Sequence, residues 1–192
     1  MALKRLEIEG YGQLEMNQVA YRRDGRIEAQ CALDATDFAN IPAENGMLLA
    51  VDKIAGTIKL PKAGSKLPVA LNYSTEHMYD ERTMALRNFN IKKDDVHGYF
   101  YPRLGYLAIG DRFTTNCLAI DDGEFADETA LAEAYEAVTA EAPLYGGVCE
   151  LGAIKVSATK PTEGPVLMAI KGPGAGSMPD GQFAIKFLVV SE

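Results

Sequence analysis

The 192-residue chain contains 47% hydrophobic and 24% charged residues and carries a formal net charge of −8. These shares are typical of globular proteins and exclude collagen, coiled coils and wholesale disorder. A chain of this length buries roughly 70% of its surface on folding, which is enough for one core without a disulfide or a metal. We therefore expect one domain over residues 1–192, which the strand patterns below identify as β-rich.

The charge balance and the first residues limit the partners. With 27 acidic and 19 basic residues, the chain lacks the excess of Lys and Arg that binding to a phosphate backbone requires, so nucleic acid is not an expected partner. No run approaches the ~20 apolar residues of a membrane helix. Residues 1–9 alternate apolar and charged where a signal peptide would have an apolar block. We expect synthesis in the cytoplasm and no membrane partner.

The cysteines indicate packing rather than chemistry. Cys31, Cys117 and Cys149 are an odd number and lack the Cys-x-x-Cys spacing of zinc knuckles. An odd set of this kind also does not suit the disulfide framework of a small secreted domain. We predict three buried free thiols, the usual state of unpaired cysteine.

A first β-hairpin is predicted near the N-terminus. Residues 26–33 alternate between an apolar and a polar face, which is the period of a half-buried strand. The preceding Asp24-Gly25 pair favours a type I′ turn. The partner strand is therefore expected within residues 14–21.

Two further strand pairs are predicted in the middle of the chain. Residues 47–52 and 57–60 flank a Gly-containing turn and form one pair. Residues 99–109 and 112–120 flank Gly-Asp and form the other. Both segments of each pair are expected to lie antiparallel to one another.

The C-terminal segment gives a clear strand pattern. Residues 183–190 alternate large apolar residues with a second set that is itself largely apolar, so this strand is expected to be covered on both faces. A Pro-Asp-Gly turn precedes it. Its antiparallel partner is predicted at residues 166–171, across a Gly-rich loop at 171–177.

The whole pattern is that of a mainly β protein. Counting single strands at residues 6–9, 69–73 and 153–157, about ten short strands are separated by turn residues, which is typical of an antiparallel sandwich or barrel. A single domain is expected. A possible C-terminal subdomain begins at about residue 121, where the composition becomes acidic.

One amphipathic helix is predicted at residues 127–142. Asp127 is placed to cap it, and Leu131, Tyr135 and Val138 recur on one face. Pro143 ends it. A second, mostly polar segment at residues 75–87 is interpreted as a short helix or an ordered loop.

No catalytic constellation is present. The chain has two histidines, His77 and His97, and neither lies near a nucleophile motif; His77 and Glu81 alone are too few ligands for a metal. The glycines at 172–176 include Pro173 and precede no helix, so they are interpreted as a hairpin loop rather than a phosphate site. The acidic stretch at 121–128 lacks a calcium-loop pattern. We therefore predict no enzyme activity, no cofactor and no metal.

An aromatic stretch is the best candidate contact surface. Residues 99–106 hold four aromatic rings together with an arginine, a composition enriched at protein interfaces, although a core strand has the same composition. A short N-terminal strand could also add to the sheet edge of a neighbouring protein. The predicted interface residues are Leu6, Ile8, Tyr99, Tyr101, Arg103 and Tyr106.

Two stretches suggest a family. Ala43-Glu-Asn-Gly-Met-Leu-Leu-Ala-Val-Asp52 places a turn before a barrel strand, and Tyr106-Leu-Ala-Ile-Gly-Asp-Arg-Phe113 has a Gly-Asp strand connection. In these stretches the chain resembles virion structural proteins of tailed bacteriophages, in particular capsid-associated decoration proteins. The two stretches cover less than a quarter of the chain.

This resemblance implies a non-enzymatic function. It implies that the protein is made in the host cytoplasm, becomes part of the virion and binds capsid or other virion proteins, in many copies on a symmetric assembly or as a homo-oligomer. One alternative is a tail or head–tail connector subunit with residues 75–87 and 61–66 as arms. The other is a small β-barrel ligand-binding domain or enzyme that uses Asp80, Glu81, Asp121 and Asp122.

Overall fold

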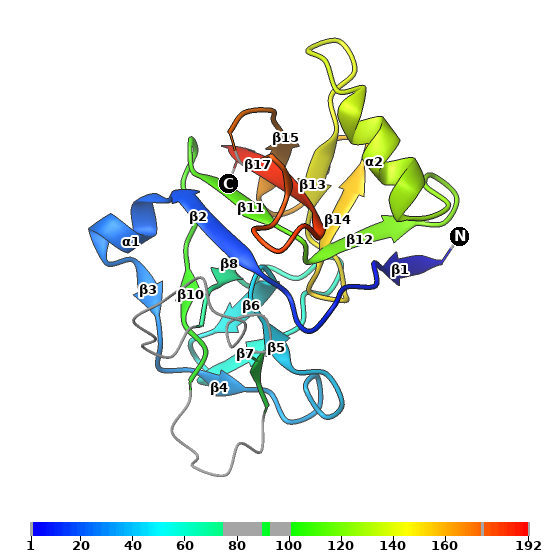
Figure 1. Ribbon diagram of the computed structural model, residues 1–192. Coiled ribbons are helices and arrows are strands. Elements are labelled where there is room, and N and C mark those ends of the chain that lie inside the picture. Colours follow the sequence, from blue (N-terminus) through cyan, green and yellow to red (C-terminus); the bar gives the residue numbers. More distant parts are fainter. Residues whose placement is uncertain (1, 75–89, 93–100, 174, 192) are drawn as a thin grey trace.

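The computed structural model describes residues 2–74, 90–92, 101–173 and 175–191 (Figure 1). As the sequence predicts, the protein is mainly β and its curled sheets form a sandwich-like or half-barrel arrangement. Figure 1 shows the larger sheet in the upper half of the molecule and the six-stranded sheet in the lower half. The predicted element at 75–87 lies outside the described residues.

The larger sheet has nine strands in the order β1-β12-β14-β13-β15-β17-β11-β2, with β16 paired to β17. Most neighbours are antiparallel, but β12 and β14 are parallel. Strands from both sides of residue 121 therefore share one sheet. The strands are β1 (Leu3–Arg5), β2 (Leu14–Gln18), β11 (Arg112–Thr115), β12 (Leu118–Asp121), β13 (Tyr145–Gly147), β14 (Ile154–Ser157), β15 (Val166–Ala169), β16 (Gly176–Ser177) and β17 (Phe183–Ser191).

The smaller sheet has six strands in the order β3-β10-β8-β6-β7-β4, and a separate antiparallel pair, β5-β9, lies beside it. β4 runs parallel to β7, and the other neighbours are antiparallel. The strands are β3 (Ile27–Glu28), β4 (Ala32–Leu33), β5 (Ala43–Glu44), β6 (Leu48–Asp52), β7 (Thr57–Lys59), β8 (Val69–Asn72), β9 (Asn90–Ile91) and β10 (Leu104–Gly105).

The predicted pairing of the C-terminal strand is confirmed, and its second face, expected to be covered, is half-buried. β17 pairs antiparallel with β15, and Ile185, Phe187 and Val189 on one face are almost completely buried. The Phe187 ring packs against Phe113 of β11, with ring centroids 5.9 Å apart. Strands β6 and β7 likewise form the predicted antiparallel hairpin.

The predicted N-terminal hairpin is wrong. β2 ends at Gln18 and pairs with β11, and the short helix α1 (Ala20–Asp24) follows it. Gly25, at φ 70°, adopts the left-handed conformation that the turn pattern indicated, but there it caps a helix. The buried Tyr21 side chain fixes α1 against β10. Its ring packs so closely on Gly105 that a Cβ atom added to Gly105 would lie 2.3 Å from the ring atoms.

The predicted pair at 99–109 and 112–120 is also wrong. β10 belongs to the smaller sheet, whereas β11 and β12 belong to the larger one, so the turn at Gly110 connects the sheets instead of closing a hairpin. The buried Asp111 stabilises this connection, since its carboxylate accepts hydrogen bonds from the N–H groups of Ala20 and Ala108. The alternation of apolar and polar residues is the same on both sides of a hairpin turn and of a connection between two sheets, so it cannot distinguish them.

The N-terminal strand begins earlier than expected. β1 is Leu3–Arg5 rather than residues 6–9, and the N–H of Leu6 donates to the Leu118 carbonyl, 3.0 Å away. The predicted strands at 69–73 and 153–157 correspond to β8 and β14.

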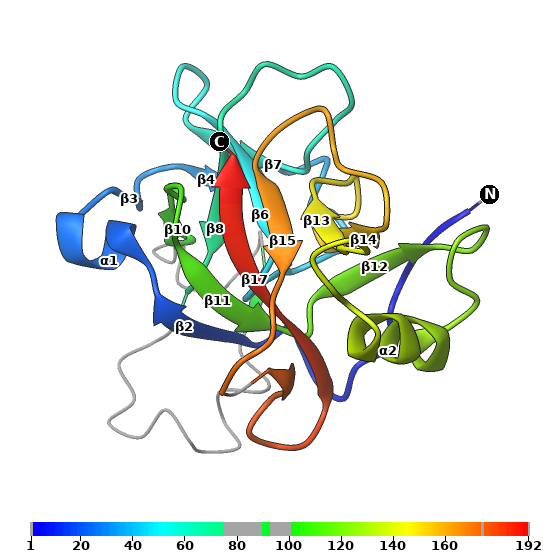
Figure 2. The same cartoon turned by 90° about the horizontal axis from the view of Figure 1, so that it is seen from above.

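The predicted helix is shorter than residues 127–142. The helix α2 spans Glu128–Glu136. Asp127 caps it as predicted, since its carboxylate accepts a hydrogen bond from the Ala130 N–H. It ends before Thr139, whose hydroxyl accepts from the Ala142 N–H and closes a turn. Leu131 and Tyr135 are buried on the larger sheet, and α1 and α2 lie at opposite sides of the molecule (Figures 1 and 2).

Both sheets contribute to both parts of the core. Along β6, Leu48 joins one buried cluster and Leu49 and Val51 join the other, as the alternation of side chains in a strand requires. The cluster with Leu48 contains Phe113, Phe187 and Leu131, and the second contains Cys117 and Cys149. The two sheets are therefore packed on each other rather than folded as separate units.

Candidate functional site

The sheets meet in a buried polar seam and in an open groove. The polar seam consists of side chains that the structure buries or half-buries between β1 and β11 of the larger sheet and β5 and β8 beside it: Arg5, Glu44, Asn45, Asn72, Ser74, Thr115 and Asn116. The groove lies between the segment 61–69 and the loops at 148–150 and 163–165.

Glu44 is the centre of the polar seam. The residue is only 4% exposed. Its carboxylate accepts two hydrogen bonds from the Arg5 guanidinium and one, 2.6 Å long, from the Gly12 N–H. Burial of Arg5 opposes its charge, but the hydrogen bonds to Glu44, together with the electrostatic effects of Cys117 and Glu44, outweigh this and raise the pKa of Arg5 above its ordinary value. The guanidinium therefore stays charged, and its contact with Glu44 joins β1 to β5.

Amide and hydroxyl groups complete the polar seam. Asn72 donates from Nδ2 to the Glu44 carbonyl at 2.7 Å, and its Oδ1 accepts from the Ser74 hydroxyl at 2.7 Å. The Asn45 side chain accepts from the Ser74 N–H at 2.8 Å. Every contact replaces water around a buried polar atom, so the polar seam fixes the sheets relative to each other.

Gly46 allows the close approach at the polar seam. It has φ 84°, and a Cβ there would lie 2.1 Å from Oγ1 of Thr115. Only glycine combines this left-handed backbone with this contact. The hydrogen bond from the Gly46 N–H to the Asn72 carbonyl, 3.0 Å long, follows from the same approach.

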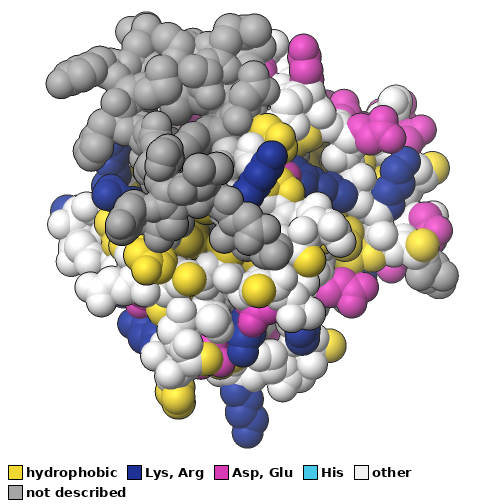
Figure 3. Space-filling view, turned by 90° about the horizontal axis from the view of Figure 1, so that it is seen from below, with side chains coloured by type: hydrophobic (Ala, Val, Ile, Leu, Met, Phe, Trp, Pro, Cys, Tyr) yellow, Lys and Arg dark blue, Asp and Glu magenta, His cyan; other side chains and the backbone are white. Residues whose placement is uncertain are grey.

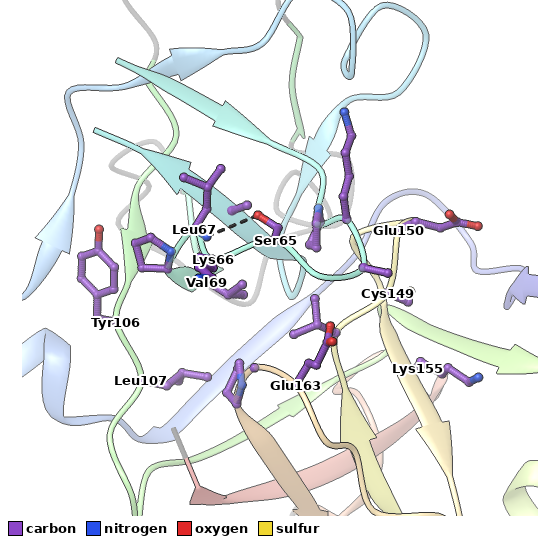
Figure 4. Close-up of a pocket in the computed structure, with 18 of the residues that line it drawn as sticks. Ser65, Lys66, Leu67, Val69, Tyr106, Leu107, Cys149, Glu150, Lys155 and Glu163 are labelled. Carbon is purple, nitrogen blue, oxygen red and sulfur yellow. Dashed lines mark hydrogen bonds between the residues drawn. The ribbon is translucent and has the colours of Figure 1, made fainter. Parts of the chain in front are cut away.

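The groove has a volume of about 630 Å³, within the range of about 300–1,000 Å³ that is typical of ligand sites. Figure 4 shows Tyr106 and Leu107 at one end and Glu150 and Lys155 at the other. The apolar lining residues are Leu3, Ala50, Pro61, Ala63, Leu67, Pro68, Val69, Leu107, Val148 and Pro165. The charged ones are Arg26, Lys62, Lys66, Glu150, Lys155 and Glu163.

The groove is open because its walls do not pair as strands. β8 and β10 are paired at Leu71 and Gly105, but the pairing stops there, so Val69 and Leu107 both line the groove. Pro61, Pro68 and Pro165 stand in the walls, and proline has no N–H to donate to a neighbouring strand. Segment 61–69 is held by local contacts, such as the hydrogen bond from the Leu67 N–H to the Ser65 hydroxyl (Figure 4), and by contacts to other parts of the chain.

The charges around the groove differ in how they are satisfied. Lys62 pairs with Asp37 at 3.1 Å, Lys155 with Asp121 at 3.4 Å, and Glu163 accepts from the Gly64 N–H at 3.1 Å. Within the part of the chain that the structure describes, the side chains of Lys66 and Glu150 form no hydrogen bond and no ion pair. Both are exposed, as is Arg26, which likewise has no ion pair with a described residue, so the groove carries unpaired charges of both signs.

Cys149 forms part of the groove wall. It is 9% exposed, and its thiol donates to the Ala153 carbonyl at 3.0 Å. Burial raises the pKa of the Cys149 thiol to about 11 and that of Cys117, which is fully buried beside the polar seam, to about 12. All three cysteines are buried and free, as predicted.

The predicted interface residues do not form one surface. Leu6 is 5% exposed and packs in the core, which excludes it as a surface contact, and Ile8 is half-buried. Tyr101 is 44% exposed and Arg103 is exposed. Tyr99 lies outside the described residues.

Among the predicted interface residues that the structure describes, Tyr106 alone lines the groove. The Lys53 ammonium lies 5.1 Å from its ring centroid and 3.4 Å from the Glu28 carboxylate. This cation–π contact holds the ring at the groove end.

The acidic stretch has structural roles. Asp121 pairs with Lys155, and the Gly123 N–H and then Lys155 lower the pKa of its carboxyl. Asp122 accepts from the Ala2 N–H, and Glu124 accepts from the Ala158 N–H. Among the described residues no cluster of His, Cys, Asp and Glu could hold a metal. On the face of the molecule shown in Figure 3, several acidic side chains lie toward one edge. His77, His97, Asp80 and Glu81 lie outside the described residues.

Comparison with known proteins adds no relative. No protein-family model, no curated protein and no solved structure matches this chain. In the described residues no helix has both the length and the apolar character needed to cross a membrane.

Sequence reasoning missed both the groove and the polar seam. The prolines at 61, 68 and 165 were the signal for the groove, since Pro61 follows β7 and Pro68 and Pro165 directly precede β8 and β15 at its wall. Glu44 and Asn72 had no signal of their own, because isolated polar residues usually lie at the surface.

Proposed function

We propose that this protein is a non-enzymatic structural protein that acts by binding other proteins, and specifically a capsid-associated decoration protein of a tailed bacteriophage. The main support is the open groove of about 630 Å³ between two packed sheets, with an apolar lining and an exposed, partly unpaired charged rim. Such a surface suits contact with another chain. The resemblance of residues 43–52 and 106–113 to virion proteins supplies the specific assignment.

A second feature supports a contact function. β1 is the edge of the nine-stranded sheet and pairs, among the described strands, with β12 alone. The Leu6 N–H donates to a carbonyl of β12, and the Ala2 carbonyl accepts from the residue that directly follows β12. Hydrogen-bonded and non-hydrogen-bonded positions alternate in an antiparallel ladder, so the backbone groups of Leu3 and Arg5 point away from β12. These groups could accept a strand from a neighbouring subunit.

A decoration protein would stabilise the shell by linkage. It binds the assembled state and not free capsid subunits, so each bound copy shifts the equilibrium toward the shell. A net charge of −8 suits the outer surface, away from packaged nucleic acid. In this proposal the partners are capsid proteins, the protein is present in many copies, and its location is the virion.

Co-sedimentation tests the proposal. Shells would be assembled from the major capsid protein encoded near this gene and mixed with increasing amounts of the purified chain. We expect saturable binding at a fixed number of copies per capsomer and a higher melting temperature of the shell. No sedimentation with shells, together with a saturable thermal shift of the isolated chain by a metal ion or a small molecule, would contradict the proposal and favour a ligand-binding domain or enzyme.

A further inference from the structure

We propose that the groove binds an extended segment of a partner protein, with apolar side chains on Leu67, Val69 and Leu107, a carboxylate at Lys66 and a cation at Glu150. This inference rests on the proposed contact function and names the surface and the chemistry of its partner. An extended segment is favoured because the groove opens where paired strands separate, between β8 and β10 in the smaller sheet.

The apolar lining supplies the attraction. Leu67 and Val69 are half-buried and Pro68 between them is exposed, so an occupant would cover apolar surface that the chain itself leaves partly open, whereas Leu107 is 7% exposed and adds little to that surface. Side chains on one face of an extended segment repeat every second residue, which matches contact with a wall formed by alternate residues 67 and 69. The prolines of the wall prevent the groove from closing on itself.

The unpaired charges supply the specificity. Lys62 and Lys155 already have carboxylate partners, whereas Lys66 and Arg26 form no ion pair with any described residue. Lys66 directly precedes the apolar contact Leu67, so it is the position at which the carboxylate of an occupant is expected. Glu150 lies at the end of the groove away from Tyr106 (Figure 4) and also has no cationic partner in the described part of the chain. A segment with one acidic and one basic residue satisfies both charges and fixes its direction.

A displayed library of random 12-residue peptides provides the probe. The library would be selected on the full chain after removal of peptides that bind the Leu67→Asp variant. This substitution removes an apolar contact and places a carboxylate beside the position expected for the carboxylate of the occupant. We expect the enriched peptides to contain apolar residues two positions apart, flanked by Asp or Glu on one side and Lys or Arg on the other. No enrichment over the Leu67→Asp variant overturns the inference.

Charge reversal then tests the contact directly. Binding of the best synthetic peptide, measured by fluorescence anisotropy, should weaken tenfold or more for Lys66→Glu and stay within twofold for Lys160→Glu, a matched exposed lysine outside the groove. A peptide in which the acidic residue is replaced by Lys should regain binding to Lys66→Glu, a result that a folding defect cannot produce. Equal binding by the wild type and the Lys66→Glu and Leu67→Asp variants overturns the inference.

Shell binding separates this inference from the proposed function. If wild-type protein selects the expected peptides but does not sediment with shells, the groove assignment holds and the decoration function fails. If the Lys66→Glu and Leu67→Asp variants sediment with shells as well as the wild type, the function holds and the groove is not the contact surface.

Discussion

The polar seam and the groove both lie between the same two sheets, yet they are built in opposite ways. In the polar seam Glu44, Asn72 and Ser74 are buried and hydrogen-bonded to one another or to backbone. In the groove Lys66 and Glu150 are exposed beside apolar side chains and pair with no described residue. The difference indicates that the polar seam provides stability and relative position, whereas the groove provides a surface for contact. Matched substitutions of the same residue type in the two regions test this division.

Glutamate should give the largest difference. Glu44→Ala leaves the Arg5 guanidinium and the Gly12 N–H without their acceptor, and we expect a loss of about 3 kcal/mol of unfolding free energy, because breaking one side of a buried ion pair leaves the other charge uncompensated. Glu150→Ala, at the groove, should change it by less than about 0.5 kcal/mol. Urea unfolding followed by circular dichroism measures both. Equal losses would show that the Glu44 pair does not hold the sheets together.

Glycine should give the next largest difference. Gly46→Ala combines a left-handed backbone with a Cβ 2.1 Å from Thr115 Oγ1, and we expect a loss of about 3 kcal/mol. Gly64→Ala in segment 61–69 has a similar φ of 72° but nothing within 4 Å of the added Cβ, so about 1 kcal/mol is expected. Both substitutions strain the backbone, so the difference between the two losses of unfolding free energy measures the effect of the close contact at Gly46. A loss at Gly46 no larger than that at Gly64 would contradict the tight contact.

Serine should give a smaller difference. Ser74→Ala removes a buried hydroxyl that donates to Asn72 and accepts from the Arg103 N–H, and we expect a loss of about 1–2 kcal/mol. Ser65→Ala at the groove rim removes one exposed acceptor for the Leu67 N–H and should cost less than about 0.5 kcal/mol. Thermal melts of the two variants provide the measurement. Similar melting temperatures would mean that the polar seam tolerates an unsatisfied group.

Alkaline pH should reduce stability gradually. The ordinary thiol pKa is 9.0, and burial raises it to about 12 for Cys117 and about 11 for Cys149 in the folded chain. Above pH 9 the unfolded chain therefore releases protons that the folded chain retains, and the unfolding free energy falls as pH rises, by roughly 1.4 kcal/mol per thiol and pH unit, until the folded thiols ionise. Cys117→Ala should flatten this decline between pH 9 and about pH 11 relative to the wild type. An unchanged slope in the variant would exclude Cys117 as its source.

The sequence predicts the parts of the fold that depend on local pattern. The alternation along β17, the hairpin of β6 and β7 and the Asp127 cap each depend on residues close together in the chain, and all are confirmed. The partners of β2 and β10 were not predictable in this way, because Gly25 and Gly110 allow a helix cap or a connection between sheets as readily as a hairpin turn.

The candidate site was less predictable for a related reason. Glu44 meets Arg5 from 39 positions away, and Lys155 meets Asp121 across two strands, so neither contact leaves a spacing in the sequence. Tyr106 was predicted as a contact residue and does line the groove, but Leu6 was predicted from the same kind of reasoning and lies in the core. Apolar residues in short strands look alike whether they face the core or a groove.

Cysteine alkylation in the presence and absence of assembled shells tests most directly whether the groove is the contact surface. The three native thiols are buried, so the probes are the variants Ser65→Cys, exposed in the groove, and Lys160→Cys, exposed outside it, and mass spectrometry of iodoacetamide-treated protein reports on each position. With shells in excess we predict that the thiol of Ser65→Cys is alkylated several times more slowly than in the free chain, while that of Lys160→Cys is alkylated at the same rate. Unchanged alkylation of Ser65→Cys in fully shell-bound protein would contradict the assignment of the groove as the surface through which this protein acts.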